Sequence, residues 1–239
     1  MSPDIPTEPL NPLRVFILCD QNDTAPIWGY IIREKGLIAL LETSVAKAMT
    51  RSSEITSDLI VIDVNVPHSE RMNLCRQFRT LTDSPILLFL PTNNEAEILE
   101  AYQLGVDECV IKPISPAIFM AKITAWARRG RAVPVTRLAP VGTGGMRLDP
   151  ARRAVVDPQR GEIRLTNLEF RLLHLLMSRP GHIFSTEEII QSVWGIYEPS
   201  DPALLKNVVY RLRKKLGGDT GETQLIQTWP GGYSYQEEA

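Results

Sequence analysis

The segment from Lys206 to Lys215 holds the side chains best suited to binding chemistry. It has no acidic residue and five basic ones, which are Lys206, Arg211, Arg213, Lys214 and Lys215. An arginine guanidinium can pair with guanine through two hydrogen bonds, whereas lysine and tyrosine side chains suit phosphate oxygens. A charged run is usually just the solvated face of a helix, so its meaning depends on the element that carries it.

That element is predicted to be an amphipathic helix over 202–216, with Asp201 as its N-cap and Pro202 at its first position. Apolar residues recur at helical spacing and face a core: Leu205, Val209, Leu212 and Leu216. A recognition helix buries one such stripe and offers the opposite face to the major groove of DNA. We therefore expect DNA contacts from that face and its flanks: Lys206, Asn207, Tyr210, Arg211, Arg213, Lys214 and Lys215.

The residues around this helix predict a small domain over 146–239. Two earlier helices open with capping-box patterns, Thr166 to Glu169 and Ser185 to Glu188. Short strand-like pieces fill 146–165, and Pro230-Gly231-Gly232 connects two more as a hairpin. The segment 131–145 (RAVPVTRLAPVGTGG) mixes proline, glycine and small residues, which is typical of a linker.

The first half of the chain has a different pattern. Residues 1–12 are proline-rich and predict a flexible arm. Over 13–130, apolar runs predict strands at Val15–Cys19, Leu37–Leu41, Leu59–Ile62, Ile86–Leu90 and Cys109–Ile111. Between and after them, helices are predicted over 25–35, 44–52, 69–80, 94–104 and 116–129. Nearly continuous apolar strands that alternate with helices favour a five-stranded parallel sheet covered on both faces, an α/β fold.

Composition excludes several classes of protein. With 44% hydrophobic and 23% charged residues the chain is globular, and its net charge of −2 does not by itself point to nucleic acid. Three cysteines without CxxC spacing and three histidines make a zinc site unlikely. No apolar run is long enough to span a bilayer and no signal pattern precedes the first domain, so we expect a cytoplasmic protein with no membrane contact.

Residues 146–235 resemble the effector domain of the winged-helix response regulators, the OmpR/PhoB class. The motifs GMRLDPARRAVVD, LTNLEFRLLHLLMSRPGHIFSTEEIIQSVWG, VVYRLRKKLG and a terminal GGY match in order over about 90 residues. The resemblance implies a four-stranded platform, a recognition helix at 202–216, and a loop at Gly195–Ser200 that contacts RNA polymerase. The chain departs from the pattern at Pro230, where a groove-reading arginine is usual, and at Tyr210, where a phosphate-binding arginine is common.

Residues 13–129 resemble the receiver domain of such regulators, which has a flavodoxin-like fold. The resemblance makes Asp63 the candidate phosphoacceptor and Lys112 the lysine that neutralises the phosphoryl group. Asp20 matches the first residue of the acidic pair and, with Asp63, is a candidate ligand of Mg²⁺. Asn65 matches the position whose backbone carbonyl also reaches the metal.

Other receiver positions depart from the family pattern. Gln21 replaces the second acid of the pair, which removes a charge from the Mg²⁺ site. Leu90 replaces the switch hydroxyl and has no group that can hydrogen-bond a phosphoryl oxygen. Cys109 replaces the aromatic switch residue, and Arg71 replaces a loop glycine. These losses predict a receiver with weak coupling between phosphorylation and rearrangement; the reading that Asp63 and Lys112 form only a buried ion pair is equally open.

The face by which receivers of this family pair is also altered. Ile118 stands where an acidic residue is usual, while Asp107 and Lys122 remain as in the family. An added apolar side chain on that face favours constitutive dimerisation, although Ile118 is equally compatible with local packing.

We therefore expect a sequence-specific, DNA-binding transcriptional regulator that forms a homodimer through its receiver domain, largely without phosphorylation. No cofactor is required in this interpretation, Mg²⁺ being the cation that the receiver pocket would take, and duplex DNA and RNA polymerase are the expected partners. The alternative is an ordinary phosphorelay regulator, which a histidine kinase activates at Asp63. A hydrolase with Asp63 as nucleophile lacks a second catalytic acid, so we do not expect an enzyme. An adaptor that no longer binds DNA is disfavoured by the basic helix.

Overall fold

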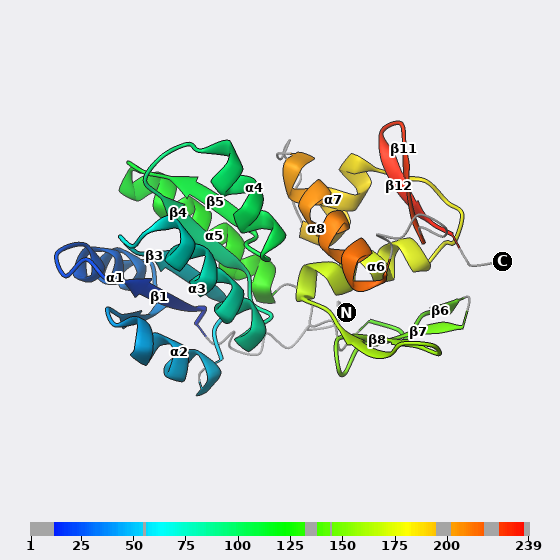
Figure 1. The fold of residues 1–239 in the computed structure, drawn as a ribbon, viewed down its shortest axis with the longest axis horizontal. Coiled ribbons are helices and arrows are strands. Elements are labelled where there is room, and N and C mark those ends of the chain that lie inside the picture. The colour runs from blue at the N-terminus through cyan, green and yellow to red at the C-terminus, as the bar shows by residue number, and fades with distance from the viewer. Residues whose placement is uncertain are drawn as a thin grey trace, which may run out of the picture.

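The structure is a computed structural model that describes residues 12–54, 56–131, 138–143, 145–194, 202–217 and 225–236. Two domains lie next to each other, and the longest axis of the molecule runs through both (Figure 1). The predicted arm (1–12) falls almost wholly outside the described residues, as do the loop Gly195–Ser200 and the N-cap Asp201.

The first domain is built on a parallel sheet in the order β2-β1-β3-β4-β5. Its strands are β1 (Arg14–Cys19), β2 (Ile38–Glu42), β3 (Leu59–Asp63), β4 (Ile86–Leu90) and β5 (Glu108–Ile111). Its helices are α1 (Thr24–Glu34), α2 (Val45–Glu54), α3 (His68–Leu81), α4 (Glu95–Gln103) and α5 (Pro116–Arg131). Every strand and helix predicted for this half is therefore present within a few residues of its expected bounds.

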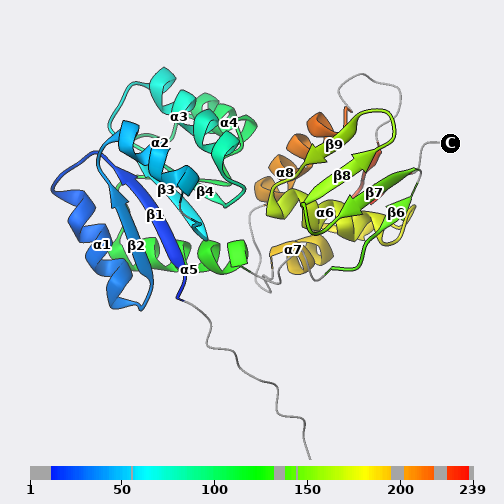
Figure 2. The same ribbon diagram turned by 90° about the horizontal axis from the view of Figure 1, so that it is seen from below.

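Helices cover both faces of this sheet, as its apolar strands require. Helices α1 and α5 lie on one face, and α2, α3 and α4 lie on the other (Figure 2). Alternate residues of β1 point to opposite sides: Ile17 packs with the α1 and α5 residues, whereas Phe16 and Leu18 pack with those of α2 and α3. The carboxyl ends of β1, β3 and β5 meet at one edge, where a flavodoxin-like fold places its ligands.

The second domain begins with a four-stranded antiparallel sheet in the order β6-β7-β8-β9. These strands are β6 (Gly142–Thr143), β7 (Met146–Asp149), β8 (Ala154–Asp157) and β9 (Gly161–Arg164). Strand β6 and the last residue of α5, Arg131, both lie within the segment 131–145 that the sequence predicts as a linker. The pairing Gly142–Arg147 and Thr143–Met146 is a tight hairpin, whose short first strand has no apolar run to reveal it.

Three helices and a small sheet complete the second domain. They are α6 (Asn167–Met177), β10 (Phe184–Ser185), α7 (Thr186–Trp194), α8 (Pro202–Lys215), β11 (Ile226–Trp229) and β12 (Gly232–Tyr235). Both capping boxes form: Thr166 and Glu169 bond reciprocally at α6, and Ser185 and Glu188 do so at α7. This is the winged helix-turn-helix that the sequence predicts.

The wing is the hairpin of β11 and β12, with Pro230-Gly231 as its turn. Gly231 has a φ of 83°, a left-handed conformation that favours glycine. Gly232 must lack a side chain for a different reason, because a Cβ there would collide with the Phe184 carbonyl of β10. Strand β12 thereby pairs with both β10 and β11 and ties the wing to the helices.

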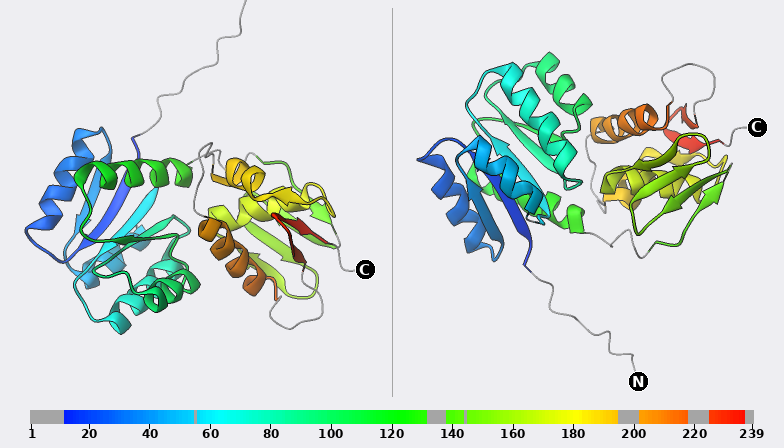
Figure 3. Two further views of the ribbon diagram at one scale, coloured as in Figure 1. Left: turned by 90° about the horizontal axis from the view of Figure 1, so that it is seen from above. Right: turned by 60° about the horizontal axis from the view of Figure 1, so that its bottom comes forward.

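The two domains touch along α8 and α4, which pack side by side (Figures 1 and 3). None of the helices within the described ranges is long and apolar enough to cross a membrane.

Candidate functional sites

Asp63, the candidate phosphoacceptor, ends β3 and is almost completely buried, with 1% of its surface exposed. Lys112 follows β5, and its Nζ donates to Asp63 Oδ1 at 2.7 Å. The indole Nε1 of Trp28 donates to the other carboxylate oxygen, Oδ2, at 3.2 Å. Both oxygens of Asp63 are thus engaged by donors from within the protein.

Trp28 was not among the residues singled out from the sequence. It lies on the buried side of α1, and its ring stacks on Phe119 of α5 with centroids 4.0 Å apart. This packing fixes the indole beside the carboxyl end of β3. The only signal in the sequence is a large aromatic residue one turn into a helix that follows Asp20, and it does not reveal which atom the indole N–H meets.

The other pocket residues offer few carboxylate oxygens to a Mg²⁺ ion. Both oxygens of Asp20 accept from the backbone N–H of Asn65, at 3.0 and 2.9 Å. Gln21 contributes a neutral amide whose Nε2 is buried without a hydrogen-bond partner. Each of the two candidate ligands, Asp20 and Asp63, thus already accepts hydrogen bonds from the protein. The neutral Gln21 brings no charge to a hard cation. Among the described residues no group of three or more His, Cys, Asp or Glu side chains could hold a metal ion.

The two substituted switch positions lie in apolar surroundings. Leu90 ends β4, is fully buried and packs in the cluster beneath α3 and α4. Cys109 lies in β5 beside that cluster, and burial raises the pKa of its thiol well above the ordinary value. Burial also raises the pKa of Cys19 to about 11 and that of Cys75 to about 12. These thiols stay protonated at neutral pH and are weak nucleophiles.

Arg71 lies in the first turn of α3 and not in a loop. Its guanidinium donates twice to Glu97 Oε1 of α4, at 2.8 and 2.6 Å, and once to the Val66 carbonyl. The arginine therefore joins two helices where the family pattern has a glycine, and this gives the substitution a structural role.

Helix α8 has the apolar stripe that the sequence predicts. Leu205, Val209, Leu212 and Leu216 are all buried. Three of the predicted DNA-contacting residues, Lys206, Tyr210 and Lys214, are exposed and lie four residues apart along one side of the helix. Lys215 is exposed as well, whereas Asn207 and Arg213 are half-buried and Arg211 is buried.

Arg213 and Lys215 are bound within their own domain. The Arg213 guanidinium donates to the Ile226 carbonyl and to Thr228 Oγ1, so it anchors the wing to α8. Lys215 Nζ donates to Glu169 Oε2 at 2.7 Å and joins α8 to the capping box of α6.

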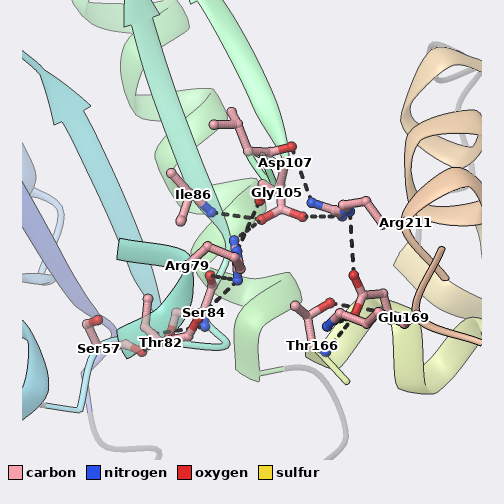
Figure 4. Close-up of polar contacts among 12 residues, drawn as sticks. Ser57, Arg79, Thr82, Ser84, Ile86, Gly105, Asp107, Thr166, Glu169 and Arg211 are labelled. Atoms are coloured by element: carbon pink, nitrogen blue, oxygen red, sulfur yellow. Dashed lines mark hydrogen bonds and ion pairs between the residues drawn. The ribbon is translucent and has the colours of Figure 1, made fainter. Parts of the chain in front are cut away.

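Arg211 does not point into solvent, which corrects the expectation from its helical position. It lies on the side of α8 away from the apolar stripe, but the first domain covers that side and leaves it 5% exposed. Its Nη2 donates to Asp107 Oδ1 at 3.0 Å, and its Nη1 donates to the Val106 carbonyl (Figure 4). Asn207, one turn earlier, is only half-buried and lines a hollow with residues of α4.

Further ion pairs extend the contact between Arg211 and Asp107 into both domains. On one side, Arg79 Nη2 donates to Asp107 Oδ2 at 2.8 Å. On the other, Glu169 Oε1 lies 3.5 Å from Arg211 Nε (Figure 4). Burial alone would raise the pKa of Glu169, but the charges of Arg211 and Lys215 outweigh it and lower that pKa. Burial alone would lower the pKa of Arg211, and the carboxylates of Asp107 and Glu169 raise it instead.

Two of the three residues on the predicted pairing face are engaged within the chain. Asp107 is held by the two arginines, and Lys122 pairs with Glu108. Ile118 is 53% exposed, so the apolar addition is not used in local packing. Leu99 of α4 is similarly exposed.

Comparison with known proteins bears on both domains. Residues 15–124 match the family described as response regulator receiver domain, and residues 160–235 match transcriptional regulatory protein, C terminal. The chain belongs to the response regulators of the OmpR/PhoB class.

Relatives of this response regulator match over nearly their full lengths. DNA-binding response regulator MtrA of Mycolicibacterium smegmatis is 28% identical over a match that covers 90% of this chain and 92% of the MtrA chain. The uncharacterized transcriptional regulatory protein YclJ of Bacillus subtilis is 30% identical over a match that covers 95% of this chain and 100% of the YclJ chain. A solved structure of a RitR mutant shares the fold, with a TM-score of 0.79 at 22% identity. The match covers 95% of this chain and 100% of the RitR chain.

Proposed function

We propose that this response regulator binds duplex DNA sequence-specifically as a homodimer, and that phosphorylation of Asp63 does not gate it. The observation that carries the second part is the state of the Asp63 carboxylate, which Lys112 and Trp28 occupy on both oxygens. A phosphoryl donor would have to displace the indole, which is itself stacked on Phe119.

The residues that would report phosphorylation also support this proposal. A switch needs contacts that differ between its two states. Leu90 offers a buried alkyl group where a hydroxyl would bind a phosphoryl oxygen. The pocket offers Mg²⁺ one carboxylate fewer than the family pattern, because Gln21 is neutral, and Asp20 already accepts from the Asn65 N–H. Asp63, Lys112 and Trp28 bind one another there, which gives them a structural role.

DNA binding is assigned to α8 and the wing. Lys206, Tyr210 and Lys214 form the exposed part of the interface, and Arg211 and Asn207 occupy the face opposite the apolar stripe. Arg213 and Lys215 position α8 against the wing and α6 and contribute positive charge. The RNA polymerase contact is proposed for the loop Gly195–Ser200, which lies outside the described residues.

Dimerisation is assigned to the face that carries Ile118 and Leu99. A second copy of the chain would bury these two exposed apolar side chains, and this burial requires no phosphoryl group. A histidine kinase is a partner only in the alternative, ordinary phosphorelay function, for which the retained Asp63 and Lys112 are the supporting observation.

The test is selection of bound sequences from a random DNA pool, followed by affinity measurements on the selected duplex. Wild type and Asp63→Asn are each measured with and without Mg²⁺ and beryllofluoride, a phosphoryl mimic. We expect one selected sequence and affinities that agree within about twofold in all conditions. A gain of about tenfold in the wild type alone, which corresponds to about 1.4 kcal/mol of coupling, would support phosphorelay control instead.

A further inference from the structure

The wing carries an exposed tryptophan next to its turn. Trp229 is the last residue of β11, and 40% of its surface is exposed, whereas Trp28, Trp126 and Trp194 are all buried. Tryptophan is highly buried on average, because most of its large side chain is apolar. A single exposed apolar residue is nevertheless common on protein surfaces, so its meaning depends on how the ring is held and on what surrounds it.

The ring of Trp229 is fixed in one orientation. Its Nε1 donates to the hydroxyl Oγ of Ser234 at 2.9 Å, and Ser234 is completely buried. The one polar atom of the indole is thus satisfied within the hairpin, so an incoming ligand would meet the carbon atoms of the ring. A side chain that is already held in place loses little conformational entropy when a ligand packs on it.

The turn beside Trp229 is fixed as well. The Gly231 carbonyl accepts from the backbone N–H of Thr186 at 2.9 Å and from the Thr186 hydroxyl at 3.1 Å, at the start of α7. Gly232 lies so close to the Phe184 carbonyl that a Cβ would collide with it. The wing is thereby held at a set position in its domain, and it presents Trp229 from a rigid base.

The wing carries no charge of its own. Residues 226–236 (IQTWPGGYSYQ) contain no lysine, arginine, aspartate or glutamate. Arg213 of α8 reaches the wing, but its guanidinium donates to the Ile226 carbonyl and to Thr228 Oγ1. Contacts between this hairpin and DNA would therefore come from hydrogen bonds and apolar surface, and not from charged side chains of the hairpin that pair with phosphates.

The position of the wing determines which part of a duplex it would meet. Arg213 joins β11 to α8, so the wing stands beside the helix that is assigned to the major groove. An element beside a groove-bound helix meets the sugar–phosphate strand that borders the major groove and the minor groove beyond that strand. In the minor groove, proteins insert apolar side chains between base steps, which unstacks the step and bends the duplex. An exposed ring on an uncharged, rigid hairpin suits this contact.

We propose that Trp229 determines part of the DNA specificity, by packing its ring into the minor groove beside the α8 site and favouring a base step that unstacks easily. The inference rests on the proposed DNA-binding function. Pyrimidine–purine steps such as TA and CA are flexible, whereas A-tracts are stiff. The preference under the wing then follows from the deformability of the duplex, while the preference under α8 follows from hydrogen bonds to base edges.

The first test combines a protein variant with a DNA variant. Duplexes are selected by full-length wild type, and footprints of wild type and Trp229→Ala are compared to locate the step under the wing. We expect TA or CA there, and we expect its replacement by AA to weaken wild-type binding about fivefold. Trp229→Ala should bind the selected duplex about tenfold more weakly than wild type and should respond to the AA replacement by less than about twofold. Equal losses for both proteins on the AA duplex would overturn the proposal.

Two further variants separate the ring from charge and from general effects. Trp229→Phe keeps an aromatic ring and should bind the selected duplex within about threefold of wild type. Neither Trp229 variant removes a charge, so the salt slope of log affinity should equal that of wild type in both. Tyr30→Ala removes an exposed aromatic side chain from α1 of the receiver domain, and as the matched control it should keep its affinity within about twofold. A loss as large as that of Trp229→Ala in this control would overturn the proposal.

Tryptophan fluorescence reports the contact in the unaltered protein. Trp229 is the exposed one of the four tryptophans, so acrylamide quenches its emission selectively, and the difference between wild type and Trp229→Phe isolates that emission. We expect the selected duplex to reduce acrylamide quenching of Trp229 about threefold, because a stacked ring is shielded from solvent. Emission that stayed as accessible in the complex as in the free protein would overturn the proposal, even if Trp229→Ala bound weakly or folded poorly.

The remaining outcomes distinguish this inference from the function on which it rests. If Trp229→Ala bound the selected duplex with wild-type affinity, the role of Trp229 would be refuted while DNA binding stood. If Trp229→Ala lowered the dimer fraction in analytical ultracentrifugation and left the affinity of the dimer unchanged, the ring would contact a second copy of the chain, and the proposal would be wrong. If wild type selected no duplex at all, the proposed function itself would be refuted.

Discussion

At the scale of single residues, the hydrogen-bond partners of Asp63 bear on what this aspartate can do. Asp63 and Lys112 alone are compatible with phosphoryl chemistry. In the proposed function Trp28 opposes this chemistry, because its N–H occupies the oxygen that Lys112 leaves free. The aspartate is then a buried acceptor for two donors, and its replacement should lower the stability of the receiver domain.

Asp63→Ala is expected to lower the free energy of unfolding of the receiver domain by about 2 kcal/mol, because it leaves the Trp28 N–H and the Lys112 ammonium without their acceptor. Urea denaturation followed by tryptophan fluorescence measures this. The control is Asp23→Ala on the exposed start of α1, where the side chain makes no capping hydrogen bond; its cost should stay below about 0.5 kcal/mol. An equal cost for both variants would contradict the buried role of Asp63.

Glu169 should make stability depend on pH. Its pKa is lowered from the ordinary value of 4.5, so its stabilising contribution is present above that value and is lost as the pH falls through the lower, folded-state pKa. Glu169→Gln should therefore be less stable than wild type at neutral pH, and the difference should shrink as the pH falls from about 5 to about 3. Unfolding midpoints across this range test it, with Glu187→Gln on the exposed part of α7 as the control. A constant difference would contradict the ion network.

At the scale of elements, α8 has three functional sides. One packs on α6 and α7, one carries Lys206, Tyr210 and Lys214 in solvent, and one lies on the receiver. Arg213 bonds to β11 and Lys215 to Glu169, so two of the basic residues set the position of the helix in its domain. The basic run of the sequence is thus divided between positioning and contact.

Lys214→Ala should weaken binding to all duplexes about equally, by about 1 kcal/mol, and reduce the salt slope of log affinity by about one, because an exposed lysine at this position displaces counterions from phosphates. Fluorescence anisotropy at several salt concentrations measures both quantities. The control is Lys47→Ala on the exposed side of α2, which should leave the slope unchanged. If Lys214→Ala altered base preference but not the salt slope, this residue would be reading bases.

At the scale of the whole molecule, one region of the receiver contacts the second domain and lies beside the proposed dimer face. Asp107 holds Arg211 of the same chain, while Ile118 and Leu99 stay exposed. The surface formed by α4, β5 and α5 therefore carries both the domain contact and the proposed dimer face.

Ile118→Arg is expected to lower the dimer fraction at least threefold, because it replaces an exposed apolar side chain by a charge that the second copy would have to desolvate. Analytical ultracentrifugation measures it. Ile183→Arg, at a similarly exposed position of the second domain, is the matched control and should leave the dimer fraction unchanged. A dimer fraction unaffected by Ile118→Arg would place the dimer contact elsewhere.

Local patterns in the sequence were sufficient for most of the elements, although not for β6, which lies in the predicted linker. The period of the apolar residues predicts each strand and helix of the receiver, the capping boxes predict the starts of α6 and α7, and the stripe of α8 predicts which side it buries. These features depend on residues close in the chain, and backbone hydrogen bonding and burial of apolar side chains act at that range. The hairpin turn at Pro230-Gly231 is likewise local.

Only the tertiary structure decided what the polar side chains meet. Trp28 and Asp63 are 35 residues apart, and Arg211 and Asp107 are 104 apart, so no spacing in the sequence relates them. The helical position of Arg211 correctly places it away from the apolar stripe, but whether that side faces water, DNA or another domain depends on how the domains pack. Hydrogen bonds and ion pairs need partners within a few ångströms, and folding alone brings residues so distant in the chain to that range.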